Sequence, residues 1–149
     1  MRMNYEAAAP AGVKALGAVY AYIAQSCLPK ALVDLVYLRV SQINGCAYCI
    51  DMHSRELLRE GVSQEKLVLV PVWREAGPLF DEDEKAALAW AETVTRVAET
   101  AIPDKEYSAA AERFEAKTLA DLTIAIGLMN AFNRLAIGFR RPAAAASQR

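Results

Sequence analysis

KALVDLVYLRVSQINGCAYCIDMH, residues 30–53, is the stretch of this sequence that decides the fold. The β-branched content of residues 30–43 would suit a buried strand, but the segment is long for a strand and lies among helical neighbours, so a helix is predicted. Asn44-Gly45 is a turn signal, and a second helix over residues 46–60 is predicted to follow it and to end at Gly61. Four apolar side chains of the first segment share one helical face: Val33, Val36, Val40 and Ile43.

Helix start and stop signals recur along the rest of the chain. Pro10 can open a first helix, Ser63 is a credible N-cap, and the acids of residues 81–84 suit a helix start, where the dipole favours them. The further helices are predicted over residues 10–27, a short segment from Ser63, residues 81–100, 104–116 and 119–139. Residues 1–9 are predicted to form a loose arm and residues 140–149 a frayed tail.

These segments predict an all-α, single-domain helical bundle. The segment 119–139 is apolar on most sides, which indicates a helix at the centre of the bundle or at a subunit interface. The chain has no alternating βα pattern and no Gly-rich phosphate loop, so no nicotinamide or flavin cofactor is expected.

The composition of the chain indicates which classes of binding partner to expect. The chain has 149 residues, which fits one domain, and its 54% hydrophobic content slightly exceeds the usual share, which favours a homo-oligomer. The formal net charge is −1 and no dense basic stripe is present, so nucleic acid is not an expected partner. No stretch reaches the roughly 18 uninterrupted apolar residues of a membrane span. The first residues do not resemble a secretory signal, and a cytoplasmic location is expected.

Two cysteines and a histidine carry the chemistry. Cys46 follows the turn, Cys49 lies three residues later, and His53 lies one helical turn beyond Cys49 on the same face. His53 can therefore reach the Cys49 sulfur or hold a water beside it, and the two thiols are close enough for a disulfide. A helix start favours Cys46 as the attacking thiolate, whereas a neighbouring base favours Cys49. We prefer Cys49, because a base in contact can take the proton.

The histidine needs an orienting partner. His53 is the only histidine in the chain, so this partner is expected to be an acid. Asp34 lies on the preceding helix and would approach His53 if the two helices pack antiparallel across the turn. Asp51 is closer to His53 in sequence. Residues two positions apart on a helix point to different faces, however, so Asp51 is not expected to contact His53.

Two simpler interpretations of these residues are a zinc site and a structural role in packing. Cys46, Cys49 and His53 offer three zinc ligands, and Cys27 could be the fourth, but the second ligand pair of a structural site is missing, so no metal is predicted. A thioredoxin-like fold would need a strand before the motif. Cys27 by itself is expected to be a small buried apolar residue. Four aromatic residues are expected to serve packing: Tyr37, Tyr48, Trp73 and Trp90.

The run from Asp34 to His53 resembles the alkylhydroperoxidase D-like (AhpD-like) branch of the carboxymuconolactone decarboxylase superfamily, and the run from Leu119 to Ile137 is similar to the second half of the same core. The resemblance implies an all-α fold, homo-oligomers that are often trimers or hexamers, and thiol-dependent reduction of hydroperoxides. It implies that the second cysteine, Cys49, attacks the peroxide and that the first, Cys46, resolves.

The resemblance also assigns the family histidine to His53 and the family glutamate to Asp34, which is one methylene shorter. Some members carry a further histidine between the cysteines, where this chain has Tyr48. The predicted function is therefore a peroxidase that takes a hydroperoxide and an external thiol or dithiol reductant. The alternatives are a redox-sensing or metal-binding dithiol protein without turnover, and a decarboxylase, although the decarboxylating members typically lack the CxxC motif.

Overall fold

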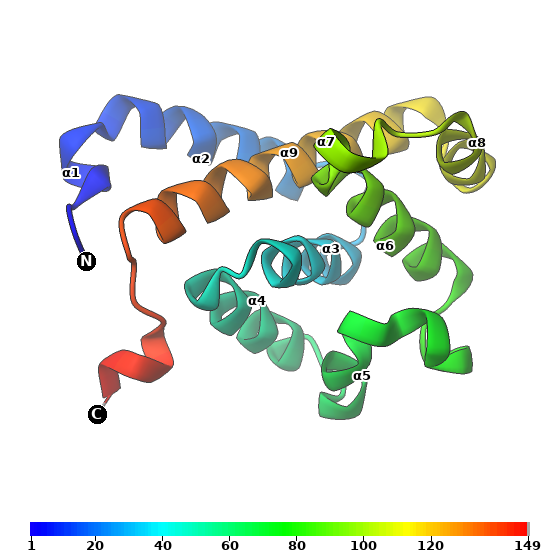
Figure 1. Ribbon diagram of the computed structural model, residues 1–149, viewed down its shortest axis with the longest axis horizontal. Helices are drawn as coiled ribbons and strands as arrows, with labels where there is room; N and C mark the ends of the chain where they lie inside the picture. Colours follow the sequence, from blue (N-terminus) through cyan, green and yellow to red (C-terminus); the bar gives the residue numbers. More distant parts are fainter. Residues whose placement is uncertain (149) are drawn as a thin grey trace.

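Helices account for all the regular secondary structure of residues 1–148, the part of the chain that the computed structural model describes (Figure 1). No strand occurs in this range, so the predicted all-α class is confirmed. In chain order the helices are α1 (Tyr5–Ala8), α2 (Pro10–Ala24), α3 (Lys30–Asn44), α4 (Ala47–Arg59), α5 (Gln64–Leu69), η1 (Val70–Glu75), η2 (Gly77–Leu79), α6 (Glu82–Thr95), α7 (Val97–Thr100), α8 (Asp104–Arg113), α9 (Ala116–Gly138) and η3 (Ala144–Gln148), where η denotes a 3-10 helix.

The turn between α3 and α4 follows the predicted signals. Gly45 has φ of 71° and ends α3 in the left-handed conformation, in which its N–H donates to the carbonyl groups of the last turn. Cys46 then acts as the N-cap of α4, and its sulfur accepts a hydrogen bond from the backbone N–H of Cys49 at 3.3 Å. A residue with a Cβ would be strained at position 45, so the chain direction here depends on glycine.

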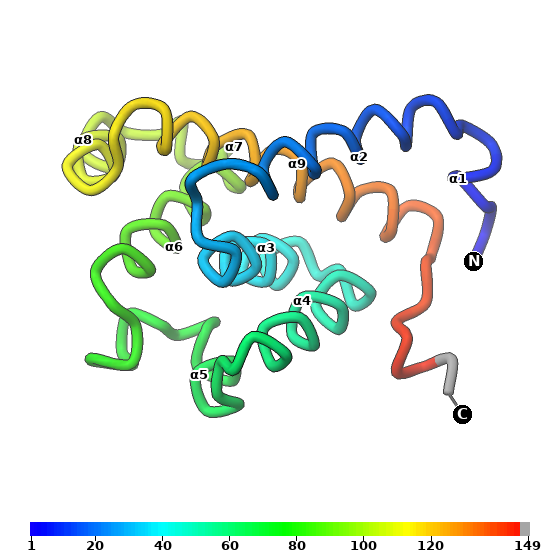
Figure 2. Tube along the Cα trace, turned by 180° about the vertical axis from the view of Figure 1, so that it is seen from behind, coloured from blue at the N-terminus to red at the C-terminus, as the bar shows by residue number. Residues whose placement is uncertain are grey.

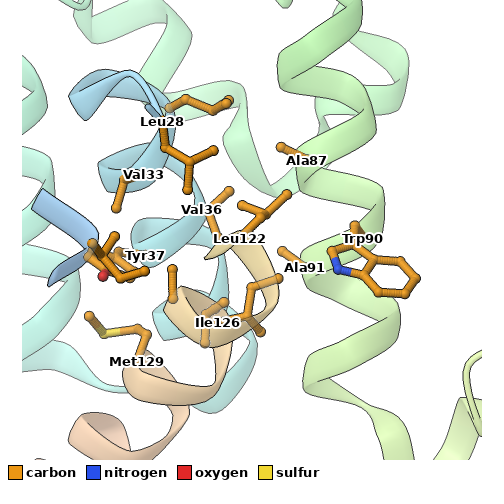
Figure 3. Packing of buried hydrophobic residues seen from close by; sticks show 14 of the residues in the cluster. Leu28, Val33, Val36, Tyr37, Ala87, Trp90, Ala91, Leu122, Ile126 and Met129 are labelled. Carbon is orange, nitrogen blue, oxygen red and sulfur yellow. The ribbon is translucent and has the colours of Figure 1, made fainter. Parts of the chain in front are cut away.

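Helix α3 lies at the centre of the bundle. It packs against α4, α6 and α9, while α2 runs beside α9 in both views (Figures 1 and 2). The main core lies where α3, α6 and α9 meet (Figure 3), and Val36, Leu122 and Ile126 are fully buried there. Truncating a core leucine of this kind to alanine costs about 2–5 kcal/mol, because the cavity left behind does not fill.

A second, smaller apolar cluster supports the other side of α3 and the C-terminal half of α4. Its members come from α3, α4, the α5–η1 segment, the connection before α6 and α6 itself, and most are fully or nearly fully buried: Leu35, Leu38, Leu57, Leu67, Val70, Trp73, Phe80 and Leu88. The two clusters hold α3 and α4 from opposite sides, so the turn that joins these helices is rigidly placed.

Most apolar side chains of α9 are buried against other helices of the same chain. The helix packs against α2, α3, α4, α6 and α8, while Ile124 stays exposed, and the oligomeric state stays a prediction. No helix within residues 1–148 is both long and apolar enough to span a membrane.

Several predicted helix ends differ from the structure: α8 ends at Arg113 and not at residue 116, and α9 starts at Ala116 and not at Leu119. The first predicted helix ends at Ala24 and not at Cys27, because the Ser26 hydroxyl donates to the Ile23 carbonyl at 2.7 Å and closes the last turn. The helix predicted over residues 81–100 breaks at Arg96. There the Thr100 hydroxyl donates to the Thr93 carbonyl at 2.8 Å and folds α7 back on α6.

The chain ends are more ordered than the predicted loose arm and frayed tail. Asn4 caps α1, Tyr5 is buried, and the Arg2 backbone N–H donates to the Phe139 carbonyl at 2.8 Å. After α9, the chain turns toward α4, where the Ala145 N–H donates to Asp51 at 3.3 Å. Both ends therefore lie at the same edge of the molecule (Figures 1 and 2). Residue 149 of the predicted tail lies outside the described residues.

Candidate active site

A disulfide joins Cys46 and Cys49 across the first turn of α4. The two Cα atoms are 5.4 Å apart, and the side chains are 1% and 3% exposed. The third cysteine, Cys27, is unpaired and exposed, so the prediction that it is buried was wrong. It follows α2 on the short connection to α3, where it contributes nothing to the core.

A polar network between α3 and α9 holds the turn that carries the dithiol. The Asn44 side chain donates to the amide oxygens of Asn130 at 3.0 Å and Asn133 at 2.9 Å. Asn133 is fully buried and in turn donates to the Ser41 hydroxyl at 3.0 Å. Buried amides with satisfied hydrogen bonds fix one arrangement of the helices that they join. The apolar pattern of α9 gave no sign of this role for its two asparagines.

Asp34 and His53 meet in the interior. The Asp34 Oδ1 atom lies 3.2 Å from His53 Nδ1, and both side chains are almost fully buried. The packing of α3 against α4 across the Gly45 turn therefore brings together the two residues that the sequence paired. Asp51 instead accepts a hydrogen bond from Arg55 at 2.9 Å on another face of α4.

Lys30 completes an acid–base chain that sequence reasoning missed. Its Nζ donates to Asp34 Oδ2 at 2.6 Å and also contacts Glu60. Burial raises the pKa of Asp34, but the hydrogen bonds from His53 and Lys30 outweigh burial, and its net pKa is lowered. Asp34 is therefore a carboxylate near neutral pH. The spacing of Lys30 and Asp34, four residues apart on one helix, was the available signal.

The ionised Asp34 orients the histidine ring through Nδ1. A carboxylate can only accept, so Nδ1 carries the proton and Nε2 of the neutral ring is left as the basic nitrogen. Nε2 is buried and has no hydrogen-bond partner among residues 1–148. The Tyr37 ring lies 5.1 Å from the imidazole, and burial raises the pKa of this tyrosine, so its hydroxyl stays protonated.

A cavity of about 260 Å³ opens onto the dithiol. Cys49 lines it, but Cys46 does not. The other lining residues are mainly aromatic and aliphatic, with Glu6 and Arg141 as the charged members: Tyr5, Glu6, Val13, Tyr20, Tyr48, Met52, Met129, Phe132, Ala136 and Arg141. Tyr48, which the sequence assigned to packing, is therefore only partly a core residue and faces this cavity.

Within residues 1–148, His, Cys, Asp and Glu side chains form no group of three or more that could hold a metal ion. The four-ligand set with Cys27 is thus not assembled. The arrangement that is assembled has a dithiol, an oriented base and an apolar cavity beside one sulfur. Such a site is suited to thiol redox chemistry on a small organic molecule.

Comparisons with known proteins show which family has this all-helical fold. The model of the carboxymuconolactone decarboxylase family matches residues 8–93. An uncharacterized protein, YdfG, of Bacillus subtilis is 32% identical over 143 residues, 96% of this chain and 97% of the relative. A shorter match, 42% identical over 45 residues, covers 30% of this chain and 25% of the alkyl hydroperoxide reductase AhpD of Corynebacterium aurimucosum.

Among solved structures, a protein of unknown function from Agrobacterium tumefaciens, described as a putative antioxidant defence protein AhpD, superposes with a TM-score of 0.91. It is 40% identical, and the match covers 95% of this chain and 97% of that one. The chain therefore belongs to the carboxymuconolactone decarboxylase family, in its AhpD-like branch.

Proposed function

We propose that this chain is a thiol-dependent peroxidase that reduces hydroperoxides through a Cys46–Cys49 dithiol/disulfide cycle. The observation that carries the proposal is the combination of this disulfide with a buried Asp34–His53 pair, whose histidine lies one turn beyond Cys49 on α4. A dithiol alone could serve many purposes, whereas an oriented base beside it is what repeated turnover requires.

The cycle begins with the reduced dithiol. His53 Nε2 takes the proton of the Cys49 thiol, and the thiolate attacks the outer oxygen of the hydroperoxide. The O–O bond breaks, the sulfur becomes a sulfenic acid, and the alkoxide leaves as an alcohol after taking a proton from His53. Asp34 acts as a positioning residue, because it orients the ring and stabilises the imidazolium that forms in between.

Cys46 then resolves the intermediate. Its sulfur attacks the Cys49 sulfenic acid, water leaves, and the Cys46–Cys49 disulfide forms. An external dithiol reduces this disulfide by exchange and supplies the two electrons that the peroxide consumed. The exposure of Cys49 to the cavity supports it as the attacking thiol, because a peroxide in the cavity meets Cys49 and not Cys46.

A peroxidase assay tests the proposal. Purified protein is mixed with cumene hydroperoxide or hydrogen peroxide and an excess of dithiothreitol or dihydrolipoamide, and peroxide loss is followed over many equivalents. We expect catalytic loss with wild type and with Cys27→Ser, and none above background with Cys49→Ser. Oxidation that stops after one equivalent, with every reductant, would instead identify a redox sensor without turnover.

A further inference from the structure

Arg141 stands at the wall of the candidate active-site cavity, although it follows α9 and is distant in sequence from the dithiol. Its guanidinium carbon lies 4.2 Å from the centre of the Tyr48 ring and 5.9 Å from that of Tyr5. Nη1 donates to the Tyr5 hydroxyl at 2.8 Å and to Glu6 at 2.6 Å. The cavity thus has one fixed cation next to the tyrosine of the CxxC motif.

The Arg141 guanidinium has N–H donors that are available to a ligand. Both hydrogen bonds use Nη1, so Nη2 and Nε have no partner among residues 1–148. The Arg141 side chain is 28% exposed, whereas its counterion Glu6 is 51% exposed. An ion pair with such an exposed carboxylate is weak, so a carboxylate arriving from the cavity could take its place. A planar guanidinium held on an aromatic face is well suited to bind that carboxylate with two hydrogen bonds.

The other residues that line the cavity indicate the size and polarity of the ligand that would fit. Side chains of Val13, Met52, Met129 and Phe132 surround the space beside Cys49 and offer no charge. The volume of about 260 Å³ is near the lower end of small-molecule sites, which start at about 300 Å³. The site therefore suits a compact apolar group with one polar end at the sulfur and one at the arginine.

We propose that the preferred substrates are organic hydroperoxides that also carry a carboxylate, which Arg141 binds in place of Glu6. This inference rests on the proposed peroxidase function and adds to it a substrate class. The reaction itself is unchanged: the O–O bond is reduced to an alcohol and water at the expense of the dithiol, and the carboxylate takes no part in the chemistry.

Arg141 also ties the C-terminal segment to α1, so a purely structural role needs a separate test. If Arg141 had only a structural role, its replacement would lower kcat/KM equally for charged and neutral substrates. Replacing its counterion Glu6 would then raise kcat/KM for neither. A carboxylate receptor predicts a charge-dependent loss when Arg141 is replaced and a charge-dependent gain when Glu6 is replaced. The two substitutions therefore give opposite effects only if the proposal is right.

The kinetic test compares para-carboxylated cumene hydroperoxide with its methyl ester, which has the same reacting group and no charge. We expect Arg141→Gln to lower kcat/KM for the acid by about tenfold to a hundredfold, mainly through KM, and to leave the ester within about twofold. Glu6→Gln should raise kcat/KM for the acid and not for the ester. Arg140→Gln is the matched control, because Arg140 is exposed and makes no side-chain hydrogen bond or ion pair within residues 1–148.

A binding test does not depend on turnover. The disulfide form of the wild-type protein is titrated calorimetrically with para-isopropylbenzoate and with its methyl ester. We expect the acid to bind more tightly than the ester, more tightly still to Glu6→Gln, and at least about tenfold more weakly to Arg141→Gln. If Arg141→Gln does not fold, the affinities of Glu6→Gln and wild type for the acid and the ester decide whether Arg141 binds a carboxylate.

The outcomes separate this inference from the function that it builds on. Equal turnover and equal binding of acid and ester, unchanged by either substitution, would overturn the inference while the peroxidase function stands. Acid binding through Arg141 without peroxide turnover would support the carboxylate site and overturn the peroxidase.

Discussion

Asp34 Oδ1 and His53 Nδ1 lie 3.2 Å apart in the interior, although 19 residues separate them in the sequence. The contact exists because α3 and α4 pack against each other on either side of the Gly45 turn. It orients the histidine from the helix opposite the dithiol, and Lys30 holds the same carboxylate from its other oxygen.

Replacing His53 by Gln should slow the reaction of Cys49 with peroxide by on the order of a hundredfold, the low end for a lost general base. Asp34→Asn should cost less, since it orients the base and transfers no proton. Stopped-flow measurement of thiol oxidation checks both, with Asp51→Asn on the same helix as a control. An Asp34→Asn protein as slow as Cys49→Ser, or as fast as wild type, would contradict this assignment.

Cys49 should be the attacking thiol and Cys46 the resolving one. Peroxide treatment of Cys46→Ser should leave a sulfenic acid at position 49 that dimedone traps, because no second thiol can condense with it. Cys49→Ser should lose the fast reaction. Mass spectrometry of the labelled peptide reads the position, and sulfenic acid at Cys46 in Cys49→Ser at the wild-type rate would reverse the roles.

The Cys46–Cys49 disulfide should form and break reversibly while Cys27 stays a thiol. Cys27 lies on the exposed connection between α2 and α3 and has no cysteine partner in the structure. Mild oxidation, alkylation and peptide mapping should therefore find Cys46 and Cys49 protected and Cys27 alkylated, and dithiothreitol added before the alkylation should return Cys46 and Cys49 to thiols. An intramolecular disulfide that contains Cys27 is the result that this prediction does not allow.

Glu92 should stabilise the fold near neutral pH and lose that effect in acid. It is buried and accepts hydrogen bonds from Arg39 at 2.7 Å, from Trp73 at 3.0 Å and from Arg74. Burial raises the pKa of Glu92, but the bonds from Arg74, Trp73 and Arg39 outweigh it, and its net pKa is lowered. Its contribution is therefore present above the unfolded pKa of about 4.3 and disappears as pH falls through the folded value.

Urea unfolding at two pH values measures this effect. Glu92→Gln should cost about 2–3 kcal/mol at pH 7 and less near pH 3, because it removes the negative charge that faces Arg39 and Arg74 and replaces the oxygen that accepts from Arg74 with an NH2 group. The control is Glu82→Gln, whose carboxylate forms an exposed pair with Lys85 and should change stability by less than about 0.5 kcal/mol. An equal loss from Glu92→Gln at both pH values would show that its charge is not the cause.

The chain should form a homo-oligomer, with a trimer or hexamer favoured by its resemblance to AhpD-like proteins. An apolar hollow lined by α1, α2 and the end of α9, including Leu16, Leu135 and Phe139, is one surface that a second copy could cover. Light scattering at micromolar concentration gives the mass directly. A monomer under these conditions would contradict the prediction.

The sequence alone determined the features that depend on neighbours along the chain. The helix of residues 30–43, the turn at Gly45 and the start of the next helix follow from local periodicity and capping. The spacing of Cys46, Cys49 and His53 places them along one helical face over about two turns whatever the rest of the fold does. For the same reason the errors lie at helix ends such as Cys27 and Arg96, where a hydroxyl bonds back to the chain.

Tertiary structure decided everything that joins separate helices. Asp34 was a conditional candidate from sequence, because its distance to His53 depends on how α3 and α4 pack. Asn133 could not be recognised, because its partner Ser41 is 92 residues away. Arg141 looked like part of a tail until the structure brought it beside Tyr48 and Glu6. Such contacts arise from the packing of whole helices, which local patterns restrict to a few arrangements but do not choose between.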